Sequence, residues 1–257
     1  MDVVVCIKRV PDTADVVEID ASGNDIETDG LAFKINDWDE YALEAAVQLT
    51  EKQGGSIIAI TVGPKEWDDV LRRALAIGAD RAIRIDQDMV TADCYAVAKV
   101  LEALIRNLSY DLVLFGAQSE DFGSAQLGVM VAELLGIPHA SLVVSLQVDQ
   151  TTARIKRELE AGTLEAYAVE LPALLTIQTG INQPRYISMA GIKRAMSKEL
   201  QVISLSDLDL TQETLSPTVM LEKLELPPKD KKAELISGSP EESAEQLARI
   251  LQNSGIF

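Results

Sequence analysis

The chain has 257 residues, 47% of them hydrophobic and 4% aromatic, and its 41 acidic against 23 basic residues give a net charge of −18. That length allows one large α/β domain or two small ones, whereas the acidic balance excludes general nucleic-acid binding and disfavours an anionic membrane surface as a partner, because both need clustered Lys and Arg. No stretch approaches the ~20 apolar residues of a membrane span, and the first residues lack the pattern of a signal peptide, so we expect a cytoplasmic protein without membrane insertion.

Strand and helix patterns alternate in the first half of the chain. Each of four continuous apolar runs is typical of a buried parallel strand. Amphipathic helical patterns lie between these runs, and the last of them has stop signals at Gly136 and Pro138. The alternation predicts an α/β fold with a doubly wound, mostly parallel sheet. The four runs cover residues 2–8, 56–63, 81–86 and 110–116.

The pattern changes at about residue 140. Period-2 stretches with turn-like breaks follow, and they predict β-hairpins that extend or abut the sheet. Residues 200–235 have a weak pattern that indicates an extended arm. We therefore expect an α/β domain at residues 1–200 and a second part, an arm with a terminal helix, at residues 201–257.

The terminal helix is the best marked of all. Ser239 can cap it, Pro240 takes the first helical position and Glu242 completes a capping box. Such an arm and helix suit a partner surface, although packing back onto the same chain is an equal alternative. The predicted buried stripe of the helix consists of Ala244, Leu247, Ala248 and Leu251.

The loop after the fourth apolar run, Gly116 to Gly128, joins a predicted strand to a predicted helix. Ligands of doubly wound sheets bind at such strand ends, where a helix N-terminus offers free N–H groups to a phosphate. Gly123, Ser124, Ala125 and Gly128 are small enough for close approach, and Gln118 and Gln126 can contact a nucleotide. Glu120 and Asp121 oppose this interpretation because they repel phosphate. The loop is no GxGxxG or Walker sequence, so an ordinary turn is an equal alternative.

Other predicted strand ends carry polar residues as well. Lys8, Arg9 and Asp12 follow the first strand, while Asn36 and Asp37 precede a helix. Each of these residues, taken alone, is explained equally well as a helix cap. Together they predict a single nucleotide crevice.

No catalytic constellation or metal site is visible in the sequence. His139 is the only histidine, no CxxC sequence occurs, and Cys6 and Cys94 lie far apart in apolar segments. Two buried free thiols are the expectation in a reducing compartment. These features favour a binding or carrier subunit over a free-standing enzyme.

Several segments in the right order resemble the beta subunits of electron transfer flavoproteins. They are "VVVCIKRVPDTA", "INDWDEYALEAAVQL", "LRRALAIGADRAIRI", "GAQSEDFGSAQLG", "IKRELEAGTLEAYAVELPALLTI" and "INQPRYISMAGIKRA". The fifth is the family's signature region, from which Ala161 and Tyr167 depart mildly. Thr13 stands where some members have a Tyr near the flavin.

The resemblance implies a nucleotide-hydrolase-like α/β fold and a heterodimer with an alpha subunit, which holds most of the redox FAD. It implies AMP in this subunit, or a second FAD with NADH as donor if the chain belongs to the electron-bifurcating branch. "SAQLG" is closer to that branch, whereas Phe122, Gly123 and Val129 depart from it. The implied nucleotide contacts are Arg9, Asn36, Asp37, Trp38, Asp39, Val62, Gly116, Ala117, Gln118, Asp121, Gly123, Ser124, Ala125, Gln126 and Leu127.

A docking loop for acyl-CoA-type dehydrogenases is implied too, with Met189 as its apolar anchor and a quinone-linked oxidoreductase as the later acceptor. A solvated loop is the alternative. A stand-alone adenine-nucleotide-binding stress-type protein is the rival function from another class. The implied docking residues are Arg185, Ile187, Ser188, Met189, Ala190, Gly191, Ile192 and Lys193.

Overall fold

The computed structural model describes residues 1–12, 17–89, 92–227, 233 and 235–255. It has two compact units, Met1–Glu222 and Lys223–Phe257, which are treated separately. None of the described helices is long and apolar enough to cross a membrane.

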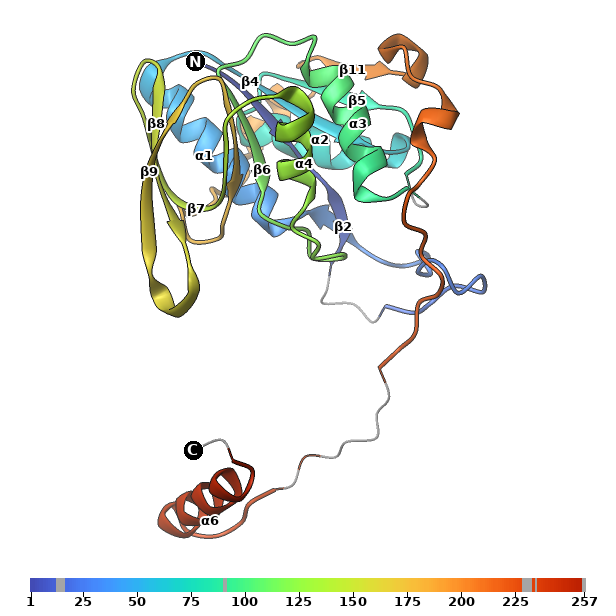
Figure 1. The fold of residues 1–257 in the computed structure, drawn as a ribbon. Helices are drawn as coiled ribbons and strands as arrows, with labels where there is room; N and C mark the ends of the chain where they lie inside the picture. Colours follow the sequence, from blue (N-terminus) through green and yellow to red (C-terminus); the bar gives the residue numbers. More distant parts are fainter. Residues whose placement is uncertain (13–16, 90–91, 228–232, 234, 256–257) are drawn as a thin grey trace. The chain divides into compact units, whose positions relative to one another are not determined.

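The first unit is built on a nine-stranded sheet with the order β11-β5-β4-β1-β6-β10-β7-β8-β9 (Figure 1). All neighbours are parallel except β7–β8 and β8–β9. A separate antiparallel pair is formed by β2 (Arg9–Pro11) and β3 (Phe33–Ile35). The strands of the large sheet are β1 (Asp2–Cys6), β4 (Ser56–Val62), β5 (Arg81–Ile85), β6 (Leu112–Gly116), β7 (His139–Val148), β8 (Thr152–Glu158), β9 (Leu164–Glu170), β10 (Ala173–Ile177) and β11 (Leu200–Ile203).

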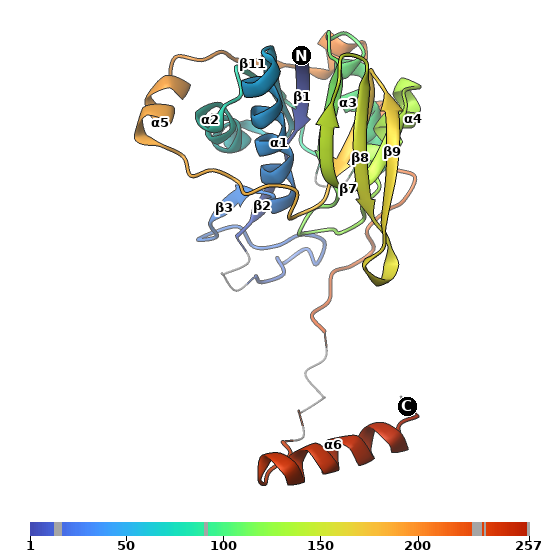
Figure 2. The same cartoon turned by 90° about the vertical axis from the view of Figure 1, so that its left-hand side faces the viewer.

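Helices cover both faces of the parallel part (Figure 2). Along β1, Val3 and Val5 pack with α1, α2 and α5, whereas Val4 and Cys6 pack with α3 and α4. Both faces of the strand are therefore buried, which explains its continuous apolar run and confirms the doubly wound α/β class. The helices are α1 (Asp37–Gln53), α2 (Asp68–Ile77), α3 (Cys94–Ile105), α4 (Leu127–Leu135) and α5 (Met189–Ala195), with short 3₁₀ turns η1 (Lys65–Trp67), η2 (Glu160–Gly162), η3 (Leu205–Leu208) and η4 (Gln212–Leu215).

The four predicted apolar strands are confirmed as β1, β4, β5 and β6, and β7–β9 form the predicted hairpins. The position of β10 differs from the prediction. It is a central strand that runs parallel to both β6 and β7 and lies between them. All five of its residues are buried, because helices cover both of its faces. A five-residue apolar run does not reveal such an insertion.

The first part of the predicted arm belongs to the first unit. β11 pairs with β5 at the sheet edge, and Leu215 is buried with the α3 side of the core. Asp93, the N-cap of α3, also accepts hydrogen bonds from the backbone N–H groups of Thr218 at 2.7 Å and Val219 at 3.1 Å. The contacts consequently divide the chain after Glu222 and not after residue 200.

The second unit contains α6 (Pro240–Asn253), and its start is as predicted. Ser239 accepts from the N–H of Glu242, and the Glu242 carboxylate accepts from the N–H of Ser239. Within this unit no residue of α6 is buried, so the cover expected for its apolar stripe stays a prediction. Leu247 and Ile250 are 47% and 40% exposed. This face has no cover among the described residues of the second unit.

Candidate functional site

The candidate nucleotide site lies where β1 and β6 end side by side. After β1 the chain reaches α1 on one face of the sheet, and after β6 it reaches α4 on the other. Connections that diverge to opposite faces from neighbouring parallel strands leave a crevice at their carboxyl ends. The structure therefore has the topological switch point that the predicted site requires.

Asp39 in the first turn of α1 ties these two strand ends together. Its Oδ2 accepts a hydrogen bond from the N–H of Lys8 at 2.8 Å, and its Oδ1 accepts one from the N–H of Gly116 at 3.0 Å. Burial raises the pKa of Asp39 to about 7, although the two N–H donors favour the charged form. The Asp39 carboxylate thus sets the spacing of the crevice walls.

Asn36 holds the loop after β6 to the start of α1. Its Nδ2 donates to the carbonyl of Gln118 at 2.8 Å, and its Oδ1 accepts from the N–H of Glu120 at 3.0 Å. Asn36 is buried, and its side chain makes no cap hydrogen bond to the backbone of the helix that it precedes. The helix-cap alternative does not hold for this side chain, which positions the loop.

Each of the two acidic residues of the loop pairs with a lysine. Lys8 Nζ lies 2.6 Å from Asp121, and Lys34 Nζ lies 3.2 Å from Glu120 and 2.7 Å from Asp37. Burial is the main cause of a raised pKa at Glu120. These ion pairs remove much of the electrostatic repulsion that the acidic side chains of the loop would exert on a bound phosphate.

Backbone donors are available at the start of α4. Among the described residues, no acceptor is found for the N–H groups of residues 124–129, and Gln126 makes no side-chain cap. Gly123 has a φ of 59° and open space where a Cβ would stand. A Cβ on Gly128 would lie 2.6 Å from Thr176 Cγ2, so this position needs glycine for the helix to pack on β10.

Some predicted contacts are already engaged by the protein. The Arg9 guanidinium pairs with Asp69 at 3.1 Å and lies 3.7 Å from the centre of the Phe33 ring. Trp38 Nε1 donates to Gln178 at 2.7 Å. Thr13 lies outside the described residues. The predicted residues that the structure brings together at the switch point are Asn36, Asp37, Asp39, Gly116, Ala117, Gln118 and Asp121, followed by the loop residues Gly123, Ser124, Ala125, Gln126 and Leu127, with Val62 buried at the end of β4.

Sequence reasoning missed Lys34, Gln178 and Arg84. Arg84 is 4% exposed; its Nη1 donates to the carbonyl of Gly63 at 2.9 Å and its Nε lies 2.7 Å from Asp68. A charged residue inside the apolar run of β5 was a usable signal for it. Nothing local marks Gln178, whose partner Trp38 is distant in sequence. Lys34 has one partner nearby, Asp37, but its pair with Glu120 joins segments that are distant in sequence. No group of three or more potential metal ligands occurs in the described part of the chain.

The predicted docking residues lie in α5 and in the segment just before it. Ser188 caps this helix by accepting from the N–H of Gly191 at 3.0 Å, and a Cβ on Gly191 would lie 2.5 Å from the carbonyl oxygen of Ala76 in α2. Four large apolar side chains next to this contact face solvent. We call them the docking patch: Tyr186, Met189, Ile192 and Met196, with exposed fractions of 97%, 81%, 44% and 79%.

Comparison with known proteins gives one consistent result. A family model described as "Electron transfer flavoprotein domain" matches residues 24–208. "Electron transfer flavoprotein subunit beta" of Bacillus subtilis is 39% identical, and the protein of that name from Methylophilus methylotrophus is 34% identical; each match covers 98% of both chains. The mitochondrial counterpart of Arabidopsis thaliana is also 34% identical, over 98% of both chains. From matches of this extent and identity, we conclude that the chain belongs to the family of electron transfer flavoprotein beta subunits.

Proposed function

We propose that this subunit holds AMP in the crevice between the ends of β1 and β6 and docks dehydrogenases, while an alpha subunit carries the FAD. The observation that carries the proposal is the loop 116–128. It combines open backbone N–H groups at the start of α4 with acidic side chains that pair with Lys8 and Lys34. A phosphate bound at such a helix start is stabilised by the N–H groups and by the helix dipole.

The residues present fit an adenosine phosphate better than a catalytic role. Asn36 and Asp39 have their polar atoms engaged by backbone groups, so they shape the crevice and leave the loop N–H groups for the ligand. The side chains of Gln118 and Gln126 can contact the nucleoside. The FAD supplies the redox chemistry of the assembled protein, and this chain contributes binding and orientation.

The docking patch supports the second half of the proposal. Apolar side chains that remain largely exposed in a folded chain mark an interaction site, and methionine adapts to more than one partner surface. Acyl-CoA-type dehydrogenases are the proposed donors, and a quinone-linked oxidoreductase is the proposed acceptor. Small, transient contacts suit a carrier that must release each partner.

The apolar face of α6, which its own unit leaves exposed, supports assembly with an alpha subunit. Residues 223–257 form a unit of their own, as a segment that packs on a partner does. Coexpression with the alpha subunit, denaturation of the purified complex and mass analysis of the released nucleotides test the function directly. We expect one FAD and one AMP per heterodimer.

The control compares two asparagines. Asn36→Ala should release AMP because the loop loses its anchor, whereas Asn24→Ala, on an exposed residue, should keep it. Two flavins per heterodimer would favour the electron-bifurcating alternative, in which the nucleotide is a second FAD and NADH is the donor. A chain that is stable and nucleotide-loaded without any partner would favour the stand-alone alternative, and an empty crevice would reject all three.

A further inference from the structure

Residues 178–185 cross the outer surface of α1 and lead into the docking patch; we call this segment the strap. Trp38 Nε1 donates to Gln178 at its beginning, at 2.7 Å. Asn182 Nδ2 donates to the carbonyl of Tyr41 at 3.0 Å in its middle. The strap is thus attached to successive turns of one rigid helix.

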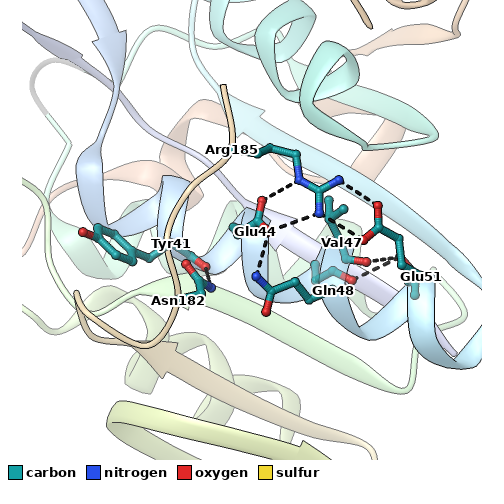
Figure 3. A network of polar contacts seen from close by, with 9 residues as sticks. Tyr41, Glu44, Val47, Gln48, Glu51, Asn182 and Arg185 are labelled. Atoms are coloured by element: carbon teal, nitrogen blue, oxygen red, sulfur yellow. Dashed lines mark hydrogen bonds and ion pairs between the residues drawn. The ribbon is translucent and has the colours of Figure 1, made fainter. Parts of the chain in front are cut away.

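Arg185 makes the last and strongest of these attachments. Its Nε and Nη2 donate to the two carboxylate oxygens of Glu44 at 2.8 and 3.1 Å. Its Nη1 and Nη2 donate to the two carboxylate oxygens of Glu51, about two helix turns further along α1, at 2.7 and 3.0 Å. Figure 3 shows the guanidinium between the two acidic side chains. Paired N–H···O bonds of this kind are directional as well as strong, so they fix orientation.

The burial of the Glu44 side chain explains why this attachment is stable. It is 4% exposed, and besides Arg185 only Gln48 donates to it among the described residues, at 2.8 Å. A buried carboxylate without its cation is costly. The hydrogen bonds that Arg185 donates to Glu51 and Glu44 hold its pKa above the ordinary value. Moving the strap away from α1 would therefore leave the Glu44 carboxylate buried without its cation, or would expose it to water.

The docking patch begins at the next residue, Tyr186. On its far side it is fixed to α2, where Arg72 Nη1 donates to the carbonyl of Ala195 at 2.9 Å and Gly191 packs against Ala76. The patch is consequently held at both ends while its apolar side chains remain in solvent. An exposed surface that is ordered before its partner arrives loses less entropy on binding.

We propose that Arg185 is the positioning residue of the docking patch: its clamp on Glu44 and Glu51 presents Tyr186 and Met189 in the orientation that a dehydrogenase with an apolar hollow recognises. The sequence indicated a docking contact for Arg185, and the structure assigns its guanidinium to the chain's own helix. The inference rests on the proposed docking function, but the order of the patch can be measured without any partner.

Two variants test the clamp in the intact heterodimer. Arg185→Gln removes both pairs, whereas Glu51→Gln removes the exposed half and leaves Glu44 with its cation, so that it folds even if the first variant does not. Hydrogen exchange followed by mass spectrometry should show roughly ten-fold faster exchange of residues 186–192 in Arg185→Gln and a smaller increase in Glu51→Gln. Arg154→Gln is the matched control, because its pair with Asp149 is exposed and lies at 3.4 Å.

Kinetics with a reduced acyl-CoA dehydrogenase as the probe give the functional readout. We expect a several-fold higher KM for the dehydrogenase with kcat and nucleotide content unchanged, and partial recovery in Arg185→Lys, which keeps the charge but loses the paired bonds. Wild-type exchange rates at residues 186–192 in both variants would overturn the inference, as would faster exchange with an unchanged KM.

Met189→Glu separates the inference from the function on which it rests. If this variant leaves KM unchanged, the docking function itself is wrong. If it raises KM while Arg185→Gln and Glu51→Gln do not, docking stands and only the role of Arg185 is rejected.

Discussion

Asp39 Oδ1 accepts a 3.0 Å hydrogen bond from the backbone N–H of Gly116, and a Cβ on Gly116 would lie 2.3 Å from that same oxygen. The glycine is thus required by the closeness of α1 to the end of β6. In Gly116→Ala, the Asp39 carboxylate must move and loses its hold on the strand end. We expect the free energy of unfolding to fall by about 1–3 kcal/mol, measured by urea denaturation, together with loss of bound nucleotide. Unchanged stability and full nucleotide content would contradict the steric argument.

Asp39 should give the protein a distinctive pH dependence. Its pKa is about 7 when folded and 3.8 in the ordinary state, so between these values the folded chain binds the proton and the unfolded chain does not. The contribution of Asp39 to the unfolding free energy therefore falls as pH rises from about 4 to 7, by up to about 4 kcal/mol. Denaturant titrations at several pH values should show this slope in the wild type and its absence in Asp39→Asn.

The control for that pH dependence is Asp37→Asn, which changes an acid of the same helix turn whose side chain is 49% exposed. It should keep the downward slope. A wild-type stability that rises steadily between pH 5 and 7 and is unaltered in Asp39→Asn would show that other groups dominate.

Lys8 should affect nucleotide affinity much more than stability. Its pair with Asp121 is partly exposed, at 32% and 24% of the two side chains, and such pairs contribute about 0–1 kcal/mol to folding. In Lys8→Gln the Asp121 charge stays unbalanced near the proposed phosphate, so AMP affinity should fall roughly ten-fold at low salt and less at high salt. Calorimetric titration of the nucleotide-stripped heterodimer measures this, with the exposed Lys52→Gln as control. Equal affinities in both variants would reject a phosphate beside Lys8.

Leu247→Asp should weaken assembly with the alpha subunit. The side chain is 47% exposed in this chain, and an aspartate there would bury a charge in the proposed interface. Gln246→Asp adds the same charge on the polar side of α6 and should assemble normally. The dissociation constant, measured by surface plasmon resonance, should rise at least ten-fold for the first variant only. Equal constants would mean that the stripe of α6 does not contact the partner.

Local patterns were enough to predict most elements of the fold. The apolar runs of β1, β4, β5 and β6 and the capping box at Ser239 are readable because their signals lie within a few residues. The pairing of β10 between β6 and β7 was not readable, since its register depends on residues about 60 positions away in the chain, such as Leu174 opposite Val113.

The candidate site, too, combines features that the sequence predicts with features that depend on distant residues. The proximity of the residues near Asn36 and Gly116 follows from topology and is seen in their hydrogen bonds, whereas nucleotide binding by them stays a prediction. Their individual roles depend on long-range pairs, such as Trp38 with Gln178 and Lys34 with Glu120, which no spacing in the sequence encodes. Arg185 was interpreted as a partner contact for the same reason, because Glu44 and Glu51 lie more than 130 residues earlier.

The central position of β10 also governs the order in which the chain can fold during synthesis. Until Ala173–Ile177 leaves the ribosome, β6 and β7 each present an unpaired edge of apolar backbone, and such edges promote aggregation. A fragment that ends at the β9 hairpin is therefore a poor candidate for independent expression, although it contains most of the crevice. The two halves of the sheet are joined only by a strand made two thirds of the way through translation.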